Sequence, residues 1–182
     1  MLYLIVGRTG SGKDTYAKYL EQYELKGVCS YTTRPKRTEY ENSHIFISQD
    51  EVAKYEKSIV ARTEINGYVY FATVDQLKEA DYYIIDPNGI KYLNKHFPEI
   101  KYTIIYIYAD DAIRKERALS RVDKKDYDKE KKVFMARNSS ESYQFDEFEK
   151  NLLANKHIII HNNNENNPNF LHEMVKLDLN LE

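Results

Sequence analysis

The sequence predicts an α/β fold built on a parallel sheet that is flanked by helices. Two observations predict it: short apolar runs recur along the chain, and segments with helical spacing separate them. The runs, each bounded by polar turns, are Leu2–Val6, Val28–Tyr31, Tyr82–Ile85, Tyr102–Tyr108 and His157–Ile160. Buried strands that alternate with helices are typical of doubly wound sheets, so we expect a five-stranded parallel sheet.

Length and charge limit the possible classes of function. The 182 residues suit one domain, and 27 Lys and Arg against 29 Asp and Glu give a net charge of −2. Without a general attraction for polyanions, neither nucleic acid nor a membrane is expected as a partner. No apolar run has transmembrane length, Met1–Val6 lacks a basic leader, and Cys29 has no cysteine to pair with. We therefore expect a cytoplasmic protein with Cys29 buried in a strand, and its oligomeric state is left open.

The first apolar run leads into a glycine-rich loop and then a helix. The loop reads Gly7-Arg8-Thr9-Gly10-Ser11-Gly12-Lys13, and Tyr16, Leu20 and Tyr23 follow it at helical spacing. This is the place of a phosphate-binding P-loop, whose N–H groups and helix dipole hold phosphates while Lys13 reaches the β- and γ-phosphates. A simple turn would explain one glycine, but not three glycines with a lysine. We expect ATP to be bound by Gly7, Arg8, Thr9, Gly10, Ser11, Gly12, Lys13, Asp14 and Thr15.

Oxygen ligands near the expected phosphates are candidates for binding Mg²⁺. Asp14 stands where the usual P-loop pattern has Ser or Thr, and Thr15 follows it. A carboxylate is also a hard oxygen ligand for Mg²⁺, bound directly or through water. Asp86 follows the third apolar run, at the end of a strand where ligands of doubly wound folds collect. We expect Asp14, Thr15 and Asp86 to bind Mg²⁺. Asp86 has two alternative roles: its side chain faces the acceptor, or it starts a turn.

Two stretches interrupt the alternation of strands and helices and predict inserted lobes. Residues 32–73 contain an apolar run at His44–Ile47 and β-favouring residues on both sides of Asn66-Gly67, which is a strong hairpin signal. Residues 121–133 are almost wholly charged and predict a mobile flap between two helices. The expected core of the single domain 1–182 then consists of residues 1–31, 74–120 and 134–182.

The chain leaves the second apolar run through Ser30-Tyr31-Thr32-Thr33-Arg34-Pro35-Lys36-Arg37. This stretch resembles the Ser-x-Thr-Thr-Arg-x-x-Arg stretch of the guanylate kinases, which are P-loop nucleoside monophosphate kinases. The resemblance implies a divergent member with the P-loop NTP hydrolase fold, an acceptor-binding lobe at 32–73 and a helical lid at 121–133. Arg34 and Arg37 match the arginines that hold the acceptor phosphate, a role that suits the fixed charge and forked donors of guanidinium. A solvated run of charges is the alternative.

Further site residues follow from the same resemblance. It implies that Ser30 lies near the acceptor base and that Tyr70 contacts the acceptor phosphate, with a cross-strand packing role as the alternative for Tyr70. His44 stands where the family has a phosphate-binding tyrosine. The arginines that match the family's catalytic lid arginines, which close over the donor phosphates, are Arg117, Arg121 and Arg137. Arg114 shares a predicted helix face with two of them, and ion pairs on the helix surface are the alternative role.

The sequence predicts ATP-dependent phosphoryl transfer to a small-molecule nucleotide, a nucleoside monophosphate, with GMP or dGMP as first candidates. The match is weakest at the residues with which the family recognises guanine. The acidic residue of the family falls near Ala61, and the next carboxylate here, Glu64, lies three residues later. Ala72 stands in place of a serine that also recognises guanine in the family. Gly-Ser-Gly-Lys-Asp and residues 41–44 also resemble ribose bisphosphate phosphokinases, so a sugar-phosphate acceptor is one alternative. A non-catalytic binding module is another, although such modules usually lose the P-loop lysine. ATP turnover without an acceptor would indicate a P-loop regulator.

Overall fold

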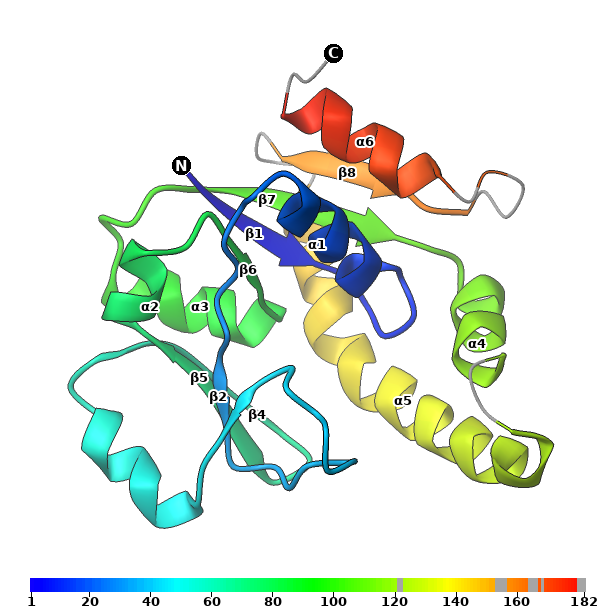
Figure 1. Ribbon diagram of the computed structural model, residues 1–182, viewed down its shortest axis with the longest axis horizontal. Coiled ribbons are helices and arrows are strands. Elements are labelled where there is room, and N and C mark those ends of the chain that lie inside the picture. Colours follow the sequence, from blue (N-terminus) through cyan, green and yellow to red (C-terminus); the bar gives the residue numbers. More distant parts are fainter. Residues whose placement is uncertain (121–122, 153–156, 164–166, 168, 180–182) are drawn as a thin grey trace. The chain divides into compact units, whose positions relative to one another are not determined.

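A computed structural model describes residues 1–120, 123–152, 157–163, 167 and 169–179 (Figure 1). The chain divides into two compact units. Unit 1 comprises residues 1–4 and 25–102, and unit 2 comprises residues 5–24 and 103–182. None of the helices in the described part of the chain is long and apolar enough to cross a membrane.

A four-stranded parallel sheet has the strand order β6-β1-β7-β8. Its strands are β1 (Leu2–Val6), β6 (Tyr82–Ile84), β7 (Tyr102–Tyr108) and β8 (Ile158–His161). β7 pairs with β8 from Ile105 opposite Ile158 to Tyr108 opposite His161. The apolar runs of β1 and β7 are largely buried, as expected for parallel strands covered on both faces. Four of the five expected strands are therefore confirmed.

The expectation of a fifth strand at 28–31 is wrong for the described residues. Gly27 makes a single parallel bridge with Tyr82, and the chain then leaves this sheet. The side-chain amide of Gln76 donates to Cys29 O at 2.6 Å, and the next residues form β2 (Tyr31–Thr32) of a second sheet. Val28 N–H still donates to Tyr82 O of β6 at 2.9 Å, but the backbone groups from Cys29 on bond elsewhere, so the run adds no strand to the parallel sheet. Cys29 is exposed, so the expectation that it is buried in a strand is also wrong.

Unit 1 contains the second sheet, of order β3-β2-β5-β4, with β3 at Ile45–Phe46, β4 at Ile59–Ile65 and β5 at Tyr68–Thr73. β4 and β5 form the antiparallel hairpin expected from Asn66-Gly67. Both turn residues have positive φ, 53° at Asn66 and 78° at Gly67, as a two-residue type I′ turn requires. One face of the hairpin packs into an apolar cluster of Val52, Ile59, Val69 and Phe71.

The remaining elements of unit 1 are the 3₁₀-helix η1 (Gln49–Tyr55), α2 (Val74–Lys78) and α3 (Pro87–His96). Thr73 and Asp86 are the N-cap residues of α2 and α3, and each side chain accepts a backbone N–H of its own helix. α3 contacts β4, so the hairpin is packed against the helix that follows β6.

Unit 2 contains α1 (Lys13–Gln22), α4 (Asp111–Leu119), η2 (Lys124–Asp126), α5 (Tyr127–Leu152) and α6 (Phe170–Asp178). Tyr16 and Leu20 are buried on α1 as expected, whereas Tyr23, the third residue of the expected stripe, is the C-cap residue of the helix and only half-buried. α1 contacts α6, and α4 contacts α5. The part of the expected flap that the structure describes contains η2 and the first turns of α5.

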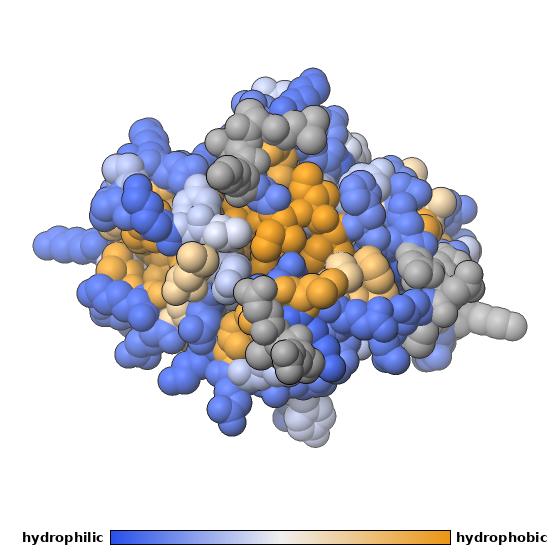
Figure 2. Space-filling model, turned by 90° about the horizontal axis from the view of Figure 1, so that it is seen from above, coloured by the Kyte–Doolittle hydropathy of each residue, from blue (hydrophilic) through white to orange (hydrophobic). Residues whose placement is uncertain are grey.

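Apolar side chains also reach the surface of unit 2. β8 is an edge strand of the parallel sheet, and its Ile159 is 39% exposed. On α6, Leu177 is 66% exposed. Figure 2 shows apolar residues gathered on the upper face of the molecule with hydrophilic residues around them.

Candidate active site

Two glycines of the expected P-loop lie in the left-handed region, Gly10 with φ 83° and Gly12 with φ 103°. A Cβ atom on Gly10 would approach the backbone oxygen of Arg114 to 2.7 Å, and one on Gly12 would approach Asn162 Nδ2 to 2.5 Å. Both positions therefore need glycine, for the backbone conformation and for space. The loop is packed closely enough to have one defined shape.

A cavity of about 330 Å³ opens at the N-terminus of α1, lined by Gly10, Gly12, Lys13, Asp14, Thr15 and Lys18. Loop N–H groups and the positive end of the helix dipole favour an anion here. The Lys13 ammonium forms no ion pair with the described residues, so its charge is available to such an anion. Lys18 was not expected in the site. It lies one helical turn after Asp14, and this spacing is the signal that could have found it.

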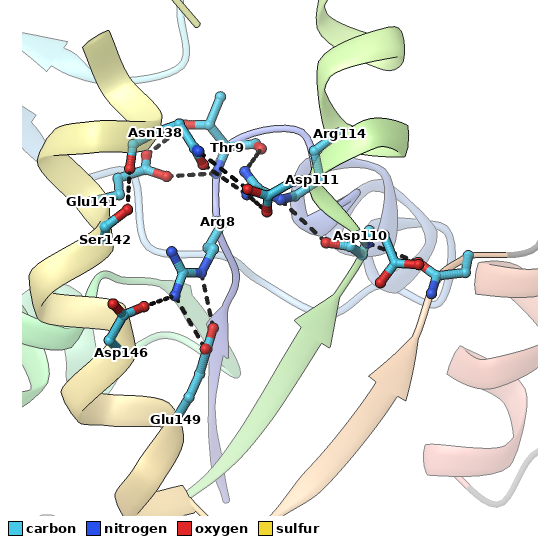
Figure 3. Close-up of polar contacts among 12 residues, drawn as sticks. Arg8, Thr9, Asp110, Asp111, Arg114, Asn138, Glu141, Ser142, Asp146 and Glu149 are labelled. Carbon is cyan, nitrogen blue, oxygen red and sulfur yellow. Dashed lines mark hydrogen bonds and ion pairs between the residues drawn. The ribbon is translucent and has the colours of Figure 1, made fainter. Parts of the chain in front are cut away.

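The side chain of Arg8 points to α5 (Figure 3), and Arg8 does not line this cavity. It donates from Nε to Glu149 at 2.9 Å and from Nη2 to Asp146 at 2.6 Å, and it lies 5.2 Å from the ring centre of Phe145. Burial alone would lower the pKa of Arg8, but the bonds to the two carboxylates outweigh burial and raise the pKa. The guanidinium of Arg8 thus joins the P-loop to α5.

Arg114 is fully buried beside the loop. Its guanidinium pairs with Asp111 and donates to Thr9 O at 2.9 Å, to Asn138 Oδ1 at 2.7 Å and to Ala109 O at 3.2 Å. Burial would raise the pKa of Asp111, but the hydrogen bond and charge of Arg114 outweigh it and lower the pKa. Arg114 is a structural support of the P-loop, and helical spacing alone could not distinguish it from Arg117.

Replacing Arg114 by leucine is expected to lower the free energy of unfolding by about 3 kcal/mol, because buried acceptors lose their donor and Asp111 loses its partner. Urea denaturation measures this change. Lys115→Ala, one residue further on α4, is the control, with an expected change within about 0.5 kcal/mol. A loss below about 1 kcal/mol for Arg114→Leu would contradict the structural role.

The three expected lid arginines differ in what the structure shows. Arg117 lies on α4 and donates from Nη2 to Asn162 O at 3.0 Å. The side chain of Asn162 in turn donates to Ser11 O at 2.8 Å, so Asn162 links Arg117 to the P-loop. Arg137 is half-buried on α5, and its guanidinium forms no ion pair with the described part of the chain. Arg121 lies outside the described residues.

Arg34 lies at the centre of a second polar cluster, in unit 1. Its guanidinium donates to Glu41 from Nη2 at 2.7 Å and from Nη1 at 3.2 Å, and the two side chains are only 10% and 14% exposed. The hydrogen bond from Arg34 lowers the pKa of Glu41 to about 2. Arg37, whose side chain is exposed, donates its backbone N–H to Glu41 at 2.6 Å. Arg34 Nε is buried and has no hydrogen-bond partner among the described residues, and the Tyr70 side chain also interacts with this guanidinium.

Ser30, His44 and Tyr70 lie together beside Arg34. Ser30 Oγ and His44 Nδ1 are 2.9 Å apart, and the His44 ring meets the Tyr70 ring edge-on at 5.5 Å. Burial, and then the positive charge of Arg34, lower the pKa of His44, so this imidazole is neutral at pH 7. Of the expected acceptor residues, Ser30, Arg34, His44 and Tyr70 are therefore neighbours, whereas Glu41 was not expected. The chain between Arg34 and Glu41 has no regular secondary structure, so no periodic spacing points to Glu41.

Acidification below about pH 6.5 is expected to destabilise the protein through His44. Its folded-state pKa is below the unfolded value of 6.5, so the unfolded state binds more protons and stability falls as the pH drops. Each unit of pKa difference corresponds to about 1.4 kcal/mol. Thermal unfolding of the wild type and His44→Asn between pH 8 and pH 5 measures the effect, and the variant should show a shallower pH dependence. Burial also lowers the pKa of His157, so His44→Asn/His157→Asn should be shallower still. An unchanged slope in His44→Asn would contradict the prediction.

Asp86 has a defined structural role at the end of β6. Its Oδ1 accepts the backbone N–H groups of Asn88 at 2.8 Å and Gly89 at 3.0 Å, which caps α3. The buried Tyr83 interacts with both Asp86 and Ser30: burial and then the charge of Asp86 raise its pKa, and a hydrogen bond with Ser30 lowers it. Asp86 is thus placed near the acceptor cluster of unit 1. Its role toward Mg²⁺ or an acceptor stays a prediction.

The hairpin has alanine at the two positions that match the guanine readers of the family. Ala61 and Ala72 face each other across the β4–β5 ladder, and both are buried. Glu64 pairs with Val69 and is exposed. Thr63 lies opposite Tyr70, and its buried Oγ1 bonds to none of the described residues. A hydroxyl, not a carboxylate, is therefore the polar group next to Tyr70 on this face.

No protein-family model matches the sequence, and a search of curated proteins found no match. Solved structures do share its fold. The guanylate kinase from Anaplasma phagocytophilum is similar with a TM-score of 0.59 and 14% identity, over 98% of this chain and 82% of that one. TT1252 from Thermus thermophilus is similar with a TM-score of 0.51 and 13% identity, over 99% and 96% of the two chains. The chain therefore has a kinase-like α/β fold, similar to that of guanylate kinase.

Proposed function

We propose that the protein is a divergent guanylate kinase-type enzyme that transfers the terminal phosphoryl group of ATP to a nucleoside monophosphate. One observation carries the proposal most directly: besides the P-loop cavity, the chain has a second cationic site, around Arg34, whose buried Nε has no hydrogen-bond partner among the described residues. A P-loop alone suits hydrolysis as well as transfer. A second site of this chemistry suits the phosphate of an acceptor, since guanidinium binds phosphate oxygens in fixed geometry.

The roles of the donor residues follow from the chemistry of phosphoryl transfer, which depends on positioning and on positive charge. Lys13 and the loop N–H groups hold the donor phosphates, and Arg117, Arg121 and Arg137 add charge to the transferred group. Asp14, Thr15 and Asp86 are the proposed oxygen ligands of Mg²⁺, which neutralises charge on the donor phosphates when bound. The carboxylate of Asp14 at the cavity suits such a cation, whose ligands are hard oxygens.

On the acceptor side, Arg34 and Arg37 bind the monophosphate, with Tyr70 and neutral His44 as further hydrogen-bond donors. Ser30 lies near the base of the acceptor. No general base is needed, because the acceptor phosphate oxygen is already anionic near neutral pH. Residues 32–73 are proposed as the acceptor lobe and 121–133 as the lid of a single cytoplasmic kinase domain.

The choice of acceptor can be tested by a coupled ADP-release assay with MgATP. The panel contains GMP, dGMP, AMP, CMP, UMP, dTMP and ribose bisphosphate, with Lys13→Ala and Arg34→Ala as controls. Turnover with GMP or dGMP that both variants lose supports the proposal. Turnover with ribose bisphosphate alone would support the sugar-phosphate alternative, which the Ala61–Ala72 pair and Asp14 favour. Tight MgATP binding without any turnover would overturn the proposal of an enzyme and favour a non-catalytic binding module.

A further inference from the structure

The P-loop and α5 are joined at three consecutive points of the helix (Figure 3). Nearest to the N-terminus of α5, the Glu141 carboxylate accepts the backbone N–H of Thr9 at 2.9 Å and its hydroxyl at 2.5 Å. Further along, Asp146 and Glu149 accept the guanidinium of Arg8. Carboxylates of α5 thus accept hydrogen bonds from Arg8 and Thr9, two loop residues that do not line the cavity at the N-terminus of α1.

The contact of Glu141 with Thr9 also fixes the place of the preceding turn of α5. Asn138, three residues before Glu141, accepts the guanidinium of Arg114, which also donates to Thr9 O. Arg137 lies four residues before Glu141, on the same face and about 6 Å along the helix axis. Arg137 therefore directly precedes the stretch of α5 in which two residues, Asn138 and Glu141, are bonded around Thr9.

Arg137 differs from Arg8 and Arg114 in having its charge available. Arg8 and Arg114 are both in ion pairs, whereas Arg137 forms none with the described residues. An arginine on this part of α5 that pairs with none of the described residues can meet the charge of a transferred phosphoryl group.

We propose that Glu141 is a positioning residue, which holds α5 on Thr9 and so sets Arg137 against the donor phosphates. This inference rests on the proposed function, because it gives Arg137 a phosphate to meet. Glu141 itself does not line the cavity, and neither does Thr9, so the carboxylate acts through α5 and not as a phosphate ligand. The links at Arg8 lie five and eight residues further along the helix. Without Glu141 the end of α5 that carries Arg137 is held less closely to the loop.

A double-mutant cycle on kcat tests the coupling between Glu141 and Arg137. Arg137→Ala is expected to lower kcat about 100-fold, and Glu141→Ala about 30-fold, with KM for ATP changed less than about threefold. Glu141→Gln, which keeps one acceptor, and Thr9→Val, which keeps the N–H, should each lower kcat less than Glu141→Ala. The double variant Glu141→Ala/Arg137→Ala should be no slower than Arg137→Ala. If the fold-losses of kcat in the two single variants multiply in the double variant, the proposal is overturned, because Glu141 then acts independently of Arg137.

Lys150→Gln is the control, since it removes one charge from an exposed position of α5 that lies outside the proposed lid, nine residues after Glu141, and its side chain bonds to no loop residue in the described structure. Its kcat should stay within about twofold of the wild type. Hydrogen exchange provides a readout without substrate: in Glu141→Gln, amides of residues 127–140 and of the P-loop should exchange faster, and in Lys150→Gln those of the P-loop should not. Equal protection of the P-loop in wild type and Glu141→Gln would overturn the proposal. The two proposals can fail separately. If Glu141→Gln exchanges faster as expected but the wild type turns over no acceptor, the proposed function is overturned, whereas the role of Glu141 in holding α5 on the P-loop is retained.

Discussion

Replacing Lys13 by alanine is expected to lower kcat about 10³-fold, with the folded structure retained. Lys13 begins α1 and lines the cavity, and its ammonium forms no ion pair with the described residues. The loop around it is held by other residues, since Arg114 binds Thr9 O and Asn162 binds Ser11 O. The substitution therefore removes charge from the phosphates without removing a support of the loop.

Lys18→Ala is the matched control for this prediction, because it removes a second lysine from the same cavity one turn further along α1. Its side chain is exposed, so a loss of no more than about tenfold is expected. The measurements are kcat in the coupled assay and the dissociation constant of MgADP by titration calorimetry. If Lys13→Ala keeps more than one tenth of wild-type turnover, the cavity does not hold the transferred phosphoryl group.

The parts of the fold that the sequence predicts correctly depend on local signals. Asn66-Gly67 specifies a two-residue turn because both residues adopt positive φ, and the hairpin forms there. The glycine loop is equally local, since spacing and its place between strand and helix identify it. The failure at 28–31 shows the limit: an apolar run predicts a strand but not its sheet. Gln76, far along the chain, bonds to Cys29 O, and no pattern within the run reveals that contact.

The supports of the candidate site show the same limit. Glu141 is separated from Thr9 by 132 residues and is one of several carboxylates on α5, so spacing does not single it out. Arg114 shares a helix face with Arg117, yet its side chain is fully buried and donates to acceptors from other elements, such as Thr9 O. Sequence reasoning finds residue types that suit phosphate, whereas the groups that hold them in place come from distant parts of the chain.

Replacing Arg34 by alanine is expected to lower kcat/KM for the acceptor about 10³-fold and to change KM for ATP less than about threefold. The effect falls on the acceptor because Arg34 belongs to unit 1, whereas the P-loop belongs to unit 2. Arg34→Lys should lose nearly as much. A lysine has no planar fork, so it cannot engage Glu41 through two nitrogens and present a third donor, as Arg34 Nε does.

Two variants separate acceptor binding from the structural part of the Arg34–Glu41 pair. Glu41→Gln weakens the same pair, so it should cost similar stability but reduce kcat/KM for the acceptor far less than Arg34→Ala. Arg62→Ala removes an arginine from β4 of the same sheet, opposite Phe71, and should leave kcat/KM within about threefold. Steady-state kinetics with each substrate varied, together with thermal unfolding, measure all four variants. If Arg34→Ala and Glu41→Gln lose equal amounts of activity and stability, Arg34 maintains the lobe and does not bind the acceptor phosphate. A rise in KM for ATP in Arg34→Ala would equally contradict the assignment, because the donor cavity contains no residue of this cluster.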